Sequence, residues 1–136
     1  MKFKILPIIA VIFFMQPIHA DYQVNGTFTT MGGCDVIVTS LSYASGKFTS
    51  IVKNIGDEPT PANVVIGVGY FVDGVAKTWG SVNGPLAVGA SVTVGTQGGS
   101  FTIPAGTHTI TAWADDVNRF TEWDENNNKL SKSITR

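Results

Sequence analysis

From residue 35 onward, apolar and polar residues alternate as they do in β-strands. The clearest case is the segment 64–72, because side chains of a strand point alternately to opposite faces. One face carries only bulky residues and is predicted to lie in the core: Val64, Ile66, Val68, Tyr70 and Val72. The other face carries Gly67 and Gly69 beside Phe71, which predicts a flat outer surface that another flat surface can approach.

Turn residues separate this segment from others of the same kind. Asp73-Gly74 is a two-residue hairpin signal, and Ala44-Ser45-Gly46 and Asn83-Gly84-Pro85 mark further turns. In the segment 108–114, Ile110 and Ala112 are expected in the core, and Thr109, Thr111 and Trp113 lie on the opposite face.

Strands are predicted at residues 36–43, 48–54, 64–72, 75–79, 90–94, 108–114 and 130–134. No segment after residue 20 carries a helical apolar stripe. Seven or eight short strands joined by turns are typical of a sandwich. The pattern therefore predicts an all-β, antiparallel β-sandwich of seven to eight strands.

The first 20 residues differ from the rest of the chain. A basic start is followed by an apolar run over residues 5–15 and by the small-residue site Ile18-His19-Ala20, which is the pattern of a cleaved secretory signal peptide. The apolar run is shorter than the roughly 20 residues that span a bilayer. We expect a signal peptide at 1–20, an N-terminal arm or edge strand at 21–34, and one sandwich domain at 35–136. The expected location is secreted, cell-surface or periplasmic in a bacterium, with no stable membrane insertion after cleavage.

Charge and cysteine content narrow the function classes. The chain has nine basic and ten acidic residues. Cleavage of the signal peptide would remove Lys2 and Lys4, which leaves seven basic residues and a net charge of −3 for the mature chain. Nucleic acids and anionic membranes select basic clusters, so neither is expected as a partner. The single Cys34 cannot form a disulfide within the chain, and its position beside Val36 and Val38 favours burial.

Catalytic residue sets are scarce after residue 20. Cys34 and His108 are then the only thiol and the only imidazole, and both are predicted on strand faces toward the core. The sequence has no phosphate-binding Gly-Lys loop, no CxxC pair and no histidine cluster for zinc. We therefore expect no enzyme activity, which leaves binding or scaffolding.

The segment 112–130 holds half of the acidic residues. Its oxygen donors are of the kind that calcium prefers, and the candidate metal ligands are Asp115, Asp116, Asn118, Glu122 and Glu125. The spacing differs from an EF-hand loop, because the third ligand and the glycine are missing. The same oxygens can instead accept from backbone N–H groups and hold the turn on the sandwich, with Arg119 neutralising Asp116 or Glu122. Both interpretations stay open at this point.

Motifs in sequence order resemble the CARDB family, the cell-adhesion-related domain of bacteria. The closing signature is the run 115–120 followed by Glu122, Glu125, Asn127 and Asn128, and the earlier motifs are VKNIG at 52–56, YFVDG at 70–74 and LAVGASVTV at 86–94. The resemblance covers residues 35–134 and implies an immunoglobulin-like or fibronectin-like β-sandwich on extracytoplasmic proteins. It implies no reaction and no common ligand. Trp123 stands where small or polar residues are common in the family, which suggests a local, acquired function.

Aromatic residues suggest what such a module binds. In an immunoglobulin-like topology, Phe71, Trp79 and Trp113 belong to strands of one sheet, and Trp123 is a further candidate. Exposed rings suit the apolar faces of sugars, at about 1–2 kcal/mol for each ring covered. Polysaccharide is therefore the expected ligand. In the alternative, the rings cover hydrophobic sheet edges, and a strand edge or the acidic loop binds an extracytoplasmic protein.

Overall fold

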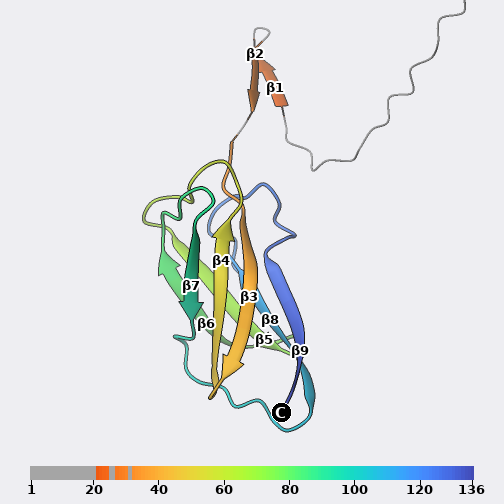
Figure 1. Cartoon of the computed structure of the whole chain (residues 1–136). Coiled ribbons are helices and arrows are strands. Elements are labelled where there is room, and N and C mark those ends of the chain that lie inside the picture. Colours follow the sequence, from red (N-terminus) through yellow and green to blue (C-terminus); the bar gives the residue numbers. More distant parts are fainter. Residues whose placement is uncertain (1–20, 25–26, 31) are drawn as a thin grey trace, which may run out of the picture.

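Two antiparallel sheets pack face to face in the computed structural model, which describes residues 21–24, 27–30 and 32–136 (Figure 1). One sheet has the strand order β3-β4-β7 and the other β6-β5-β8-β9. The strands are β3 (Val36–Ala44), β4 (Lys47–Asn54), β5 (Val65–Val72), β6 (Val75–Asn83), β7 (Ser91–Gly95), β8 (Thr107–Ala114) and β9 (Lys129–Thr135). This arrangement confirms the predicted immunoglobulin-like β-sandwich.

The predicted strand ends agree with the structure to within one residue, except at β6. The sequence pattern ended this strand at Trp79, whereas the strand continues to Asn83. The turn residues Gly84 and Pro85 follow directly, so turn chemistry rather than the loss of alternation ends the strand.

The expected arm before the sandwich contains two further strands. β1 (Asp21–Val24) pairs antiparallel with β2 (Thr27–Thr30), and the pair forms a two-stranded sheet of its own. Figure 1 shows this hairpin beyond the end of the sandwich at which β3 begins. The predicted signal peptide, residues 1–20, lies outside the described residues.

The predicted two-residue turn at Asp73-Gly74 and the predicted turn at Ala44-Ser45-Gly46 both have the backbone that a tight hairpin needs. Asp73 and Gly74 have φ of 51° and 79°, and Ser45 and Gly46 have φ of 50° and 80°. Two consecutive residues with positive φ define the type I′ turn, whose twist matches that of the flanking strands. These turns fix the β5–β6 and β3–β4 registers.

The core lies between the sheets and confirms the predicted strand faces. Buried residues of the four-stranded sheet include Ile66, Val68, Tyr70, Val72, Ile110 and Ala112. Val64 is only half-buried, because it precedes β5 and packs at the margin of the core. Tyr70 also joins the sheets, since its hydroxyl donates to Val94 O at 2.7 Å and its ring stacks on Phe48 at 5.1 Å.

A buried asparagine at the end of β4 explains the motif at 52–56. Asn54 Oδ1 accepts from the backbone N–H of Asp35 and of Gly56, and its Nδ2 donates to the carbonyls of Glu58 and Leu86. Four hydrogen bonds satisfy a fully buried amide and fix three chain segments at one end of the sandwich. The motif is therefore structural.

The loop between β8 and β9, residues 115–128, closes the same end of the sandwich. Its first residue donates from Asp115 N to Gly67 O of β5, and Trp123 N donates to Cys34 O just before β3. Phe120 lies between these attachments and is buried against the core. The loop thus spans from one sheet to the other. Within the described residues, no helix is long and apolar enough to cross a membrane.

Candidate functional site

The outer face of the four-stranded sheet brings two of the predicted aromatic residues into one row. Gly69 of β5 is paired with Trp79 of β6 on one side and with Trp113 of β8 on the other. Side chains of directly paired residues are neighbours on the same face. The two tryptophans therefore flank the position where residue 69 has no side chain.

The expected flat, open surface over the glycines of β5 is wrong. A Cβ at Gly69 would lie 2.7 Å from Asp116 Oδ2, and a Cβ at Gly67 would collide with Arg119 Nη1. The loop 115–128 folds back over β5, so Asp116 and Arg119 fill the space that the missing side chains leave. Alternation along one strand cannot reveal a cover that comes from a segment about 50 residues later.

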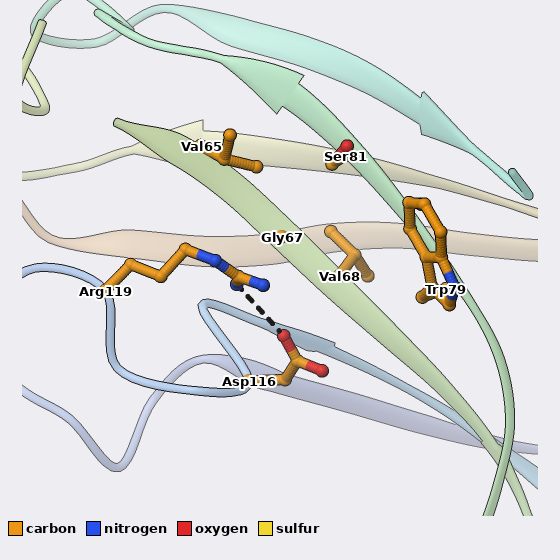
Figure 2. A pocket seen from close by; sticks show the side chains of 8 residues that line it. Val65, Gly67, Val68, Trp79, Ser81, Asp116 and Arg119 are labelled. Carbon is orange, nitrogen blue, oxygen red and sulfur yellow. Dashed lines mark hydrogen bonds and ion pairs between the residues drawn. The ribbon is translucent and has the colours of Figure 1, made fainter. Parts of the chain in front are cut away.

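A shallow depression of about 410 Å³ lies between this cover and β6 (Figure 2). Its lining includes Val65, Gly67, Trp79, Ser81, Asp116 and Arg119. Of these, Trp79 is predicted from the sequence as a sugar-binding residue and Asp116 as a metal ligand, whereas Val65, Ser81 and Arg119 are not predicted as site residues. The only signal for them was the pair of glycines, which marks a close approach by another segment.

The three aromatic residues of this face do not form one flat platform. Trp79 is 53% exposed, whereas Phe71 and Trp113 are half-buried. The rings of Phe71 and Trp113 are 6.0 Å apart and tilted by 36°, so they pack on each other. Lys129 Nζ lies 3.6 Å from the centre of the Trp113 ring. Trp79 is thus the ring with the most surface available to a ligand.

Trp123, the fourth aromatic candidate, lies at the end of the sandwich near the start of β3. Its ring rests against Gly33, where an added Cβ would approach within 2.8 Å, and its backbone N–H donates to Cys34 O. The structure therefore does not bring Trp123 together with the aromatic residues of β5, β6 and β8.

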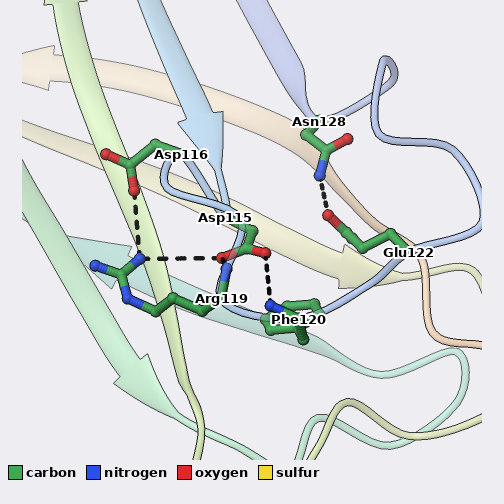
Figure 3. A network of polar contacts seen from close by, with 6 residues as sticks. All are labelled: Asp115, Asp116, Arg119, Phe120, Glu122 and Asn128. Atoms are coloured by element: carbon green, nitrogen blue, oxygen red, sulfur yellow. Dashed lines mark hydrogen bonds and ion pairs between the residues drawn. The ribbon is translucent and has the colours of Figure 1, made fainter.

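Among the candidate metal ligands, Asp115 is fully buried and holds the backbone of its own loop (Figure 3). Its Oδ1 accepts from Arg119 N at 3.0 Å and its Oδ2 from Phe120 N at 3.3 Å. Arg119 Nη1 lies 3.9 Å from Asp115 Oδ1 and 3.5 Å from Asp116 Oδ1. Burial raises the pKa of Asp115, and the two N–H donors and the guanidinium oppose that rise.

Glu122 is buried at the other half of the loop and anchors it to β3. Its Oε1 accepts from Val36 N at 2.6 Å, and its Oε2 accepts from Asn128 Nδ2. Burial raises the pKa of the Glu122 carboxyl to about 8; the Val36 and Asn128 hydrogen bonds oppose this, and the charges of Asp115 and Glu125 add to it. Glu122 therefore favours its protonated form in the folded state at neutral pH.

The remaining candidate metal ligands, Glu125 and Asn118, have other roles in the structure. Glu125 Oε1 accepts from Glu122 N at 2.9 Å, and Asn118 is an exposed turn residue with φ of 49°. Over residues 21–24, 27–30 and 32–136, no three His, Cys, Asp or Glu side chains converge in a way that could hold a metal ion. Asp115, Glu122 and Glu125 accept from backbone or amide N–H groups, and Asp116 is paired with Arg119, so these side chains do not converge on a metal site.

Cys34 and His108 do not meet in the structure. Cys34 is buried near the loop 115–128, where its Sγ donates to Thr121 O at 3.6 Å, and burial raises its pKa to about 11. His108 lies at the start of β8, at the opposite end of the sandwich, where its Nδ1 is 2.7 Å from Asp73 Oδ2. The two side chains therefore do not form a nucleophile and base pair.

Comparison with known proteins gives a clear family match. The family model of CARDB matches residues 34–132. A CARDB domain from Pyrococcus furiosus, crystallised in complex with di-metal ions, is 19% identical with a TM-score of 0.56, over 79% of this chain and 96% of that domain. A solution structure of residues 272–376 of a protein from Methanosarcina acetivorans, ascribed to the cell surface, is 22% identical with a TM-score of 0.61, over 75% of this chain and 90% of that chain. No curated protein matches the chain.

Proposed function

Because the chain belongs to the CARDB family, we propose that it is a non-catalytic binding module that acts outside the cell and recognises extracellular polysaccharide. The binding surface is the outer face of the four-stranded sheet. Support for the location comes from the predicted signal peptide and from the similarity to a domain ascribed to a cell surface protein.

One observation carries the proposal. Trp79 is 53% exposed on a strand, directly beside a depression that also contains a carboxylate and a guanidinium. Large aromatic side chains usually bury most of their surface, and an apolar ring next to hydrogen-bonding groups is the combination that a sugar needs. The affinity expected from one ring and a few hydrogen bonds is weak, about 0.1–1 mM for a single site.

Protein binding by strand addition has less support, because the outer edge of β6 is already covered. Trp79 O accepts from the backbone N–H of both Gln97 and Gly98, and Ser81 O accepts from Gln97 Nε2. The edge strand β3 contains an irregularity between Val38 and Ser40, which interrupts a regular ladder. Strand addition needs a row of unpaired backbone groups. Of the four edge strands of the sandwich, β3, β6, β7 and β9, β6 and β3 do not present a complete row.

Calcium has no part in the proposal. The similar Pyrococcus domain was crystallised with di-metal ions, but Asp115 and Glu122 of this chain already use both carboxyl oxygens for N–H donors. A hard cation that took these oxygens as ligands would have to enter a buried site and share them with the N–H donors.

The test is a glycan array probed with the mature chain, followed by calorimetric titration of the polysaccharides that bind. We expect Trp79→Ala to weaken binding about 5- to 30-fold, because one ring contributes about 1–2 kcal/mol. The variant should lower the free energy of unfolding by less than about 1 kcal/mol, since the side chain is exposed.

Trp123→Ala is the matched control, because it removes the same side chain from a site away from this face. Equal binding by the Trp79→Ala variant and the unmodified chain would contradict the proposal. So would a Trp79→Ala loss of several kcal/mol in stability, which would assign the ring to the core.

A further inference from the structure

The outer face of β5 carries two side chains that come from another segment of the chain. Asp116 takes the place of the side chain that Gly69 lacks, and Arg119 takes the place of the one that Gly67 lacks. In Figure 2 both side chains extend from the loop toward β5, on the side of the sheet that carries Trp79. The loop therefore supplies the sheet with two charged groups at defined register positions.

The strand register places these groups in an array with two residues of β6. Gly69 is paired with Trp79, and Gly67 is paired with Ser81. Asp116 is therefore beside Trp79, and Arg119 is beside Ser81. Strands lie about 5 Å apart and alternate residues about 7 Å apart, so the four groups span an area close to that of one pyranose ring.

The array has the chemical variety that a sugar ring requires. Trp79 offers an apolar ring face, the Asp116 carboxylate accepts hydrogen bonds, and the Arg119 guanidinium donates them. Ser81 Oγ donates to Gln97 Oε1 at 3.0 Å, which fixes the orientation of this hydroxyl. Ser81 also lines the depression, and its hydroxyl oxygen can accept a further hydrogen bond.

Asp116 and Arg119 retain hydrogen-bonding capacity for a ligand. Their own contact is 3.5 Å, which is longer than a strong charge-assisted hydrogen bond. Their side chains are 22% and 36% exposed. The hydrogen bonds that hold the loop backbone here are made by Asp115 instead. Asp116 is thus not needed to close the loop.

We propose that this array is a subsite for one neutral pyranose unit, with Trp79 stacked on its C–H face and Asp116 and Arg119 bound to its ring hydroxyls; this inference rests on the proposed polysaccharide function. The opposite charges of Asp116 and Arg119 cancel, which matches an uncharged ligand. The carboxylate of a uronate would be repelled by the Asp116 carboxylate at short range. The free ammonium group of an amino sugar would be repelled by the Arg119 guanidinium.

The experiment compares neutral and uronic-acid polysaccharides by calorimetric titration against single variants. Asp116→Asn replaces the anionic acceptor by an amide of the same shape, and Arg119→Lys keeps the charge but removes the planar fork of donors. We expect each to weaken binding of the neutral polymer about tenfold, as the loss of one charge-assisted hydrogen bond predicts. Asp124→Asn makes the same charge change in the same loop outside the depression and should bind within twofold of the unmodified chain.

Gly69→Ala provides a variant that leaves all ligand-contacting side chains in place. The new Cβ would meet Asp116 Oδ2 at 2.7 Å and Phe71 Cε2 at 2.9 Å, so both the carboxylate beside Trp79 and the Phe71 ring must shift. We expect weaker binding of the neutral polymer, again by about tenfold. A melting curve of each variant confirms that the fold is intact.

The outcomes separate the subsite from the function on which it rests. If Trp79→Ala loses binding while Asp116→Asn, Arg119→Lys and Gly69→Ala bind as the unmodified chain does, the subsite is wrong and the sheet-face function stands. A preference for uronic-acid polymers overturns the neutral-ligand assignment alone. If no polysaccharide binds, both proposals fall.

Discussion

Two acidic residues of the loop 115–128, Asp116 and Glu122, lie in opposite surroundings. In the first half, Asp116 is part-exposed beside Arg119 and faces the outer surface of the sheet. In the second half, Glu122 is 6% exposed, and its described hydrogen-bond partners are the uncharged Val36 N–H and Asn128 amide. Burial separates the two: Asp116 keeps contact with water and a cation, whereas burial makes the Glu122 carboxyl favour its protonated form.

The largest effect on the free energy of unfolding should follow from removing the buried carboxyl group of Glu122. Glu122→Ala leaves the buried N–H of Val36 and the amide of Asn128 without acceptors, and each unsatisfied buried donor costs about 1–3 kcal/mol. We expect the free energy of unfolding, measured by urea denaturation, to fall by about 3 kcal/mol. Glu125→Ala, which removes an exposed acid of the same loop, should cost less than about 1 kcal/mol. Equal losses would show that burial does not distinguish the two positions.

The protonation of Glu122 should appear in the pH dependence of stability. Its pKa is about 8 in the folded chain against 4.5 in the unfolded chain. Between these values the folded state binds the proton that the unfolded state has released, so stability is full below pH 4.5 and falls as the pH rises toward 8. From pH 5 to 7 we expect a loss of about 2 kcal/mol, near the upper limit for one proton.

Glu122→Gln is the control for the slope of the free energy of unfolding against pH. The amide of the new side chain keeps an acceptor for Val36 N–H and does not titrate. The slope should flatten in this variant, although Asp35 and Asp115, whose pKa values are also raised by burial, leave a contribution of the same sign. An unchanged slope in Glu122→Gln would place the titrating group elsewhere.

The sequence predicted the sandwich well because each strand reports its own alternation. Val68 and Ile110 are bulky, alternate with smaller or polar neighbours and are buried as expected. The turn at Asp73-Gly74 is equally local, since the sequence pair itself favours positive φ. The fold class and the buried face of each strand therefore follow from short-range patterns.

The candidate site was harder to predict because it depends on contacts between distant segments. Asp116 and Arg119 reach Gly69 and Gly67 across about 50 residues, and composition alone could not decide whether the acids bind metal or backbone. Trp123 was grouped with the other tryptophans by residue type, yet it lies near Gly33. Alternation gives the face of a side chain but not what folds over that face.

Arg119 should matter for stability more than its exposed partner Asp116 does. Arg119→Gln removes the cation near the fully buried Asp115 carboxylate, which leaves only backbone donors to stabilise it. We expect a loss of about 1 kcal/mol for Arg119→Gln and less than about 0.5 kcal/mol for Asp116→Asn, because exposed ion pairs contribute little. Urea denaturation at low and high salt checks both values. A larger loss for Asp116→Asn would give the outer pair a structural role.

The smallest expected effect on the free energy of unfolding is that of adding a metal ion. A cation that binds only the folded state raises the free energy of unfolding by RT ln(1 + [L]/Kd), about 2.7 kcal/mol at a hundredfold excess over Kd. Since Asp115 and Glu122 already satisfy backbone and amide donors, thermal unfolding in calcium, magnesium and chelator should give superimposable curves at fixed ionic strength. A rise in calcium that Asp116→Asn or Glu122→Gln blunts would instead place a metal in this loop. That result would mean that the acids of the loop rearrange to admit a cation, and the contrast between Asp116 and Glu122 would then hold only without metal.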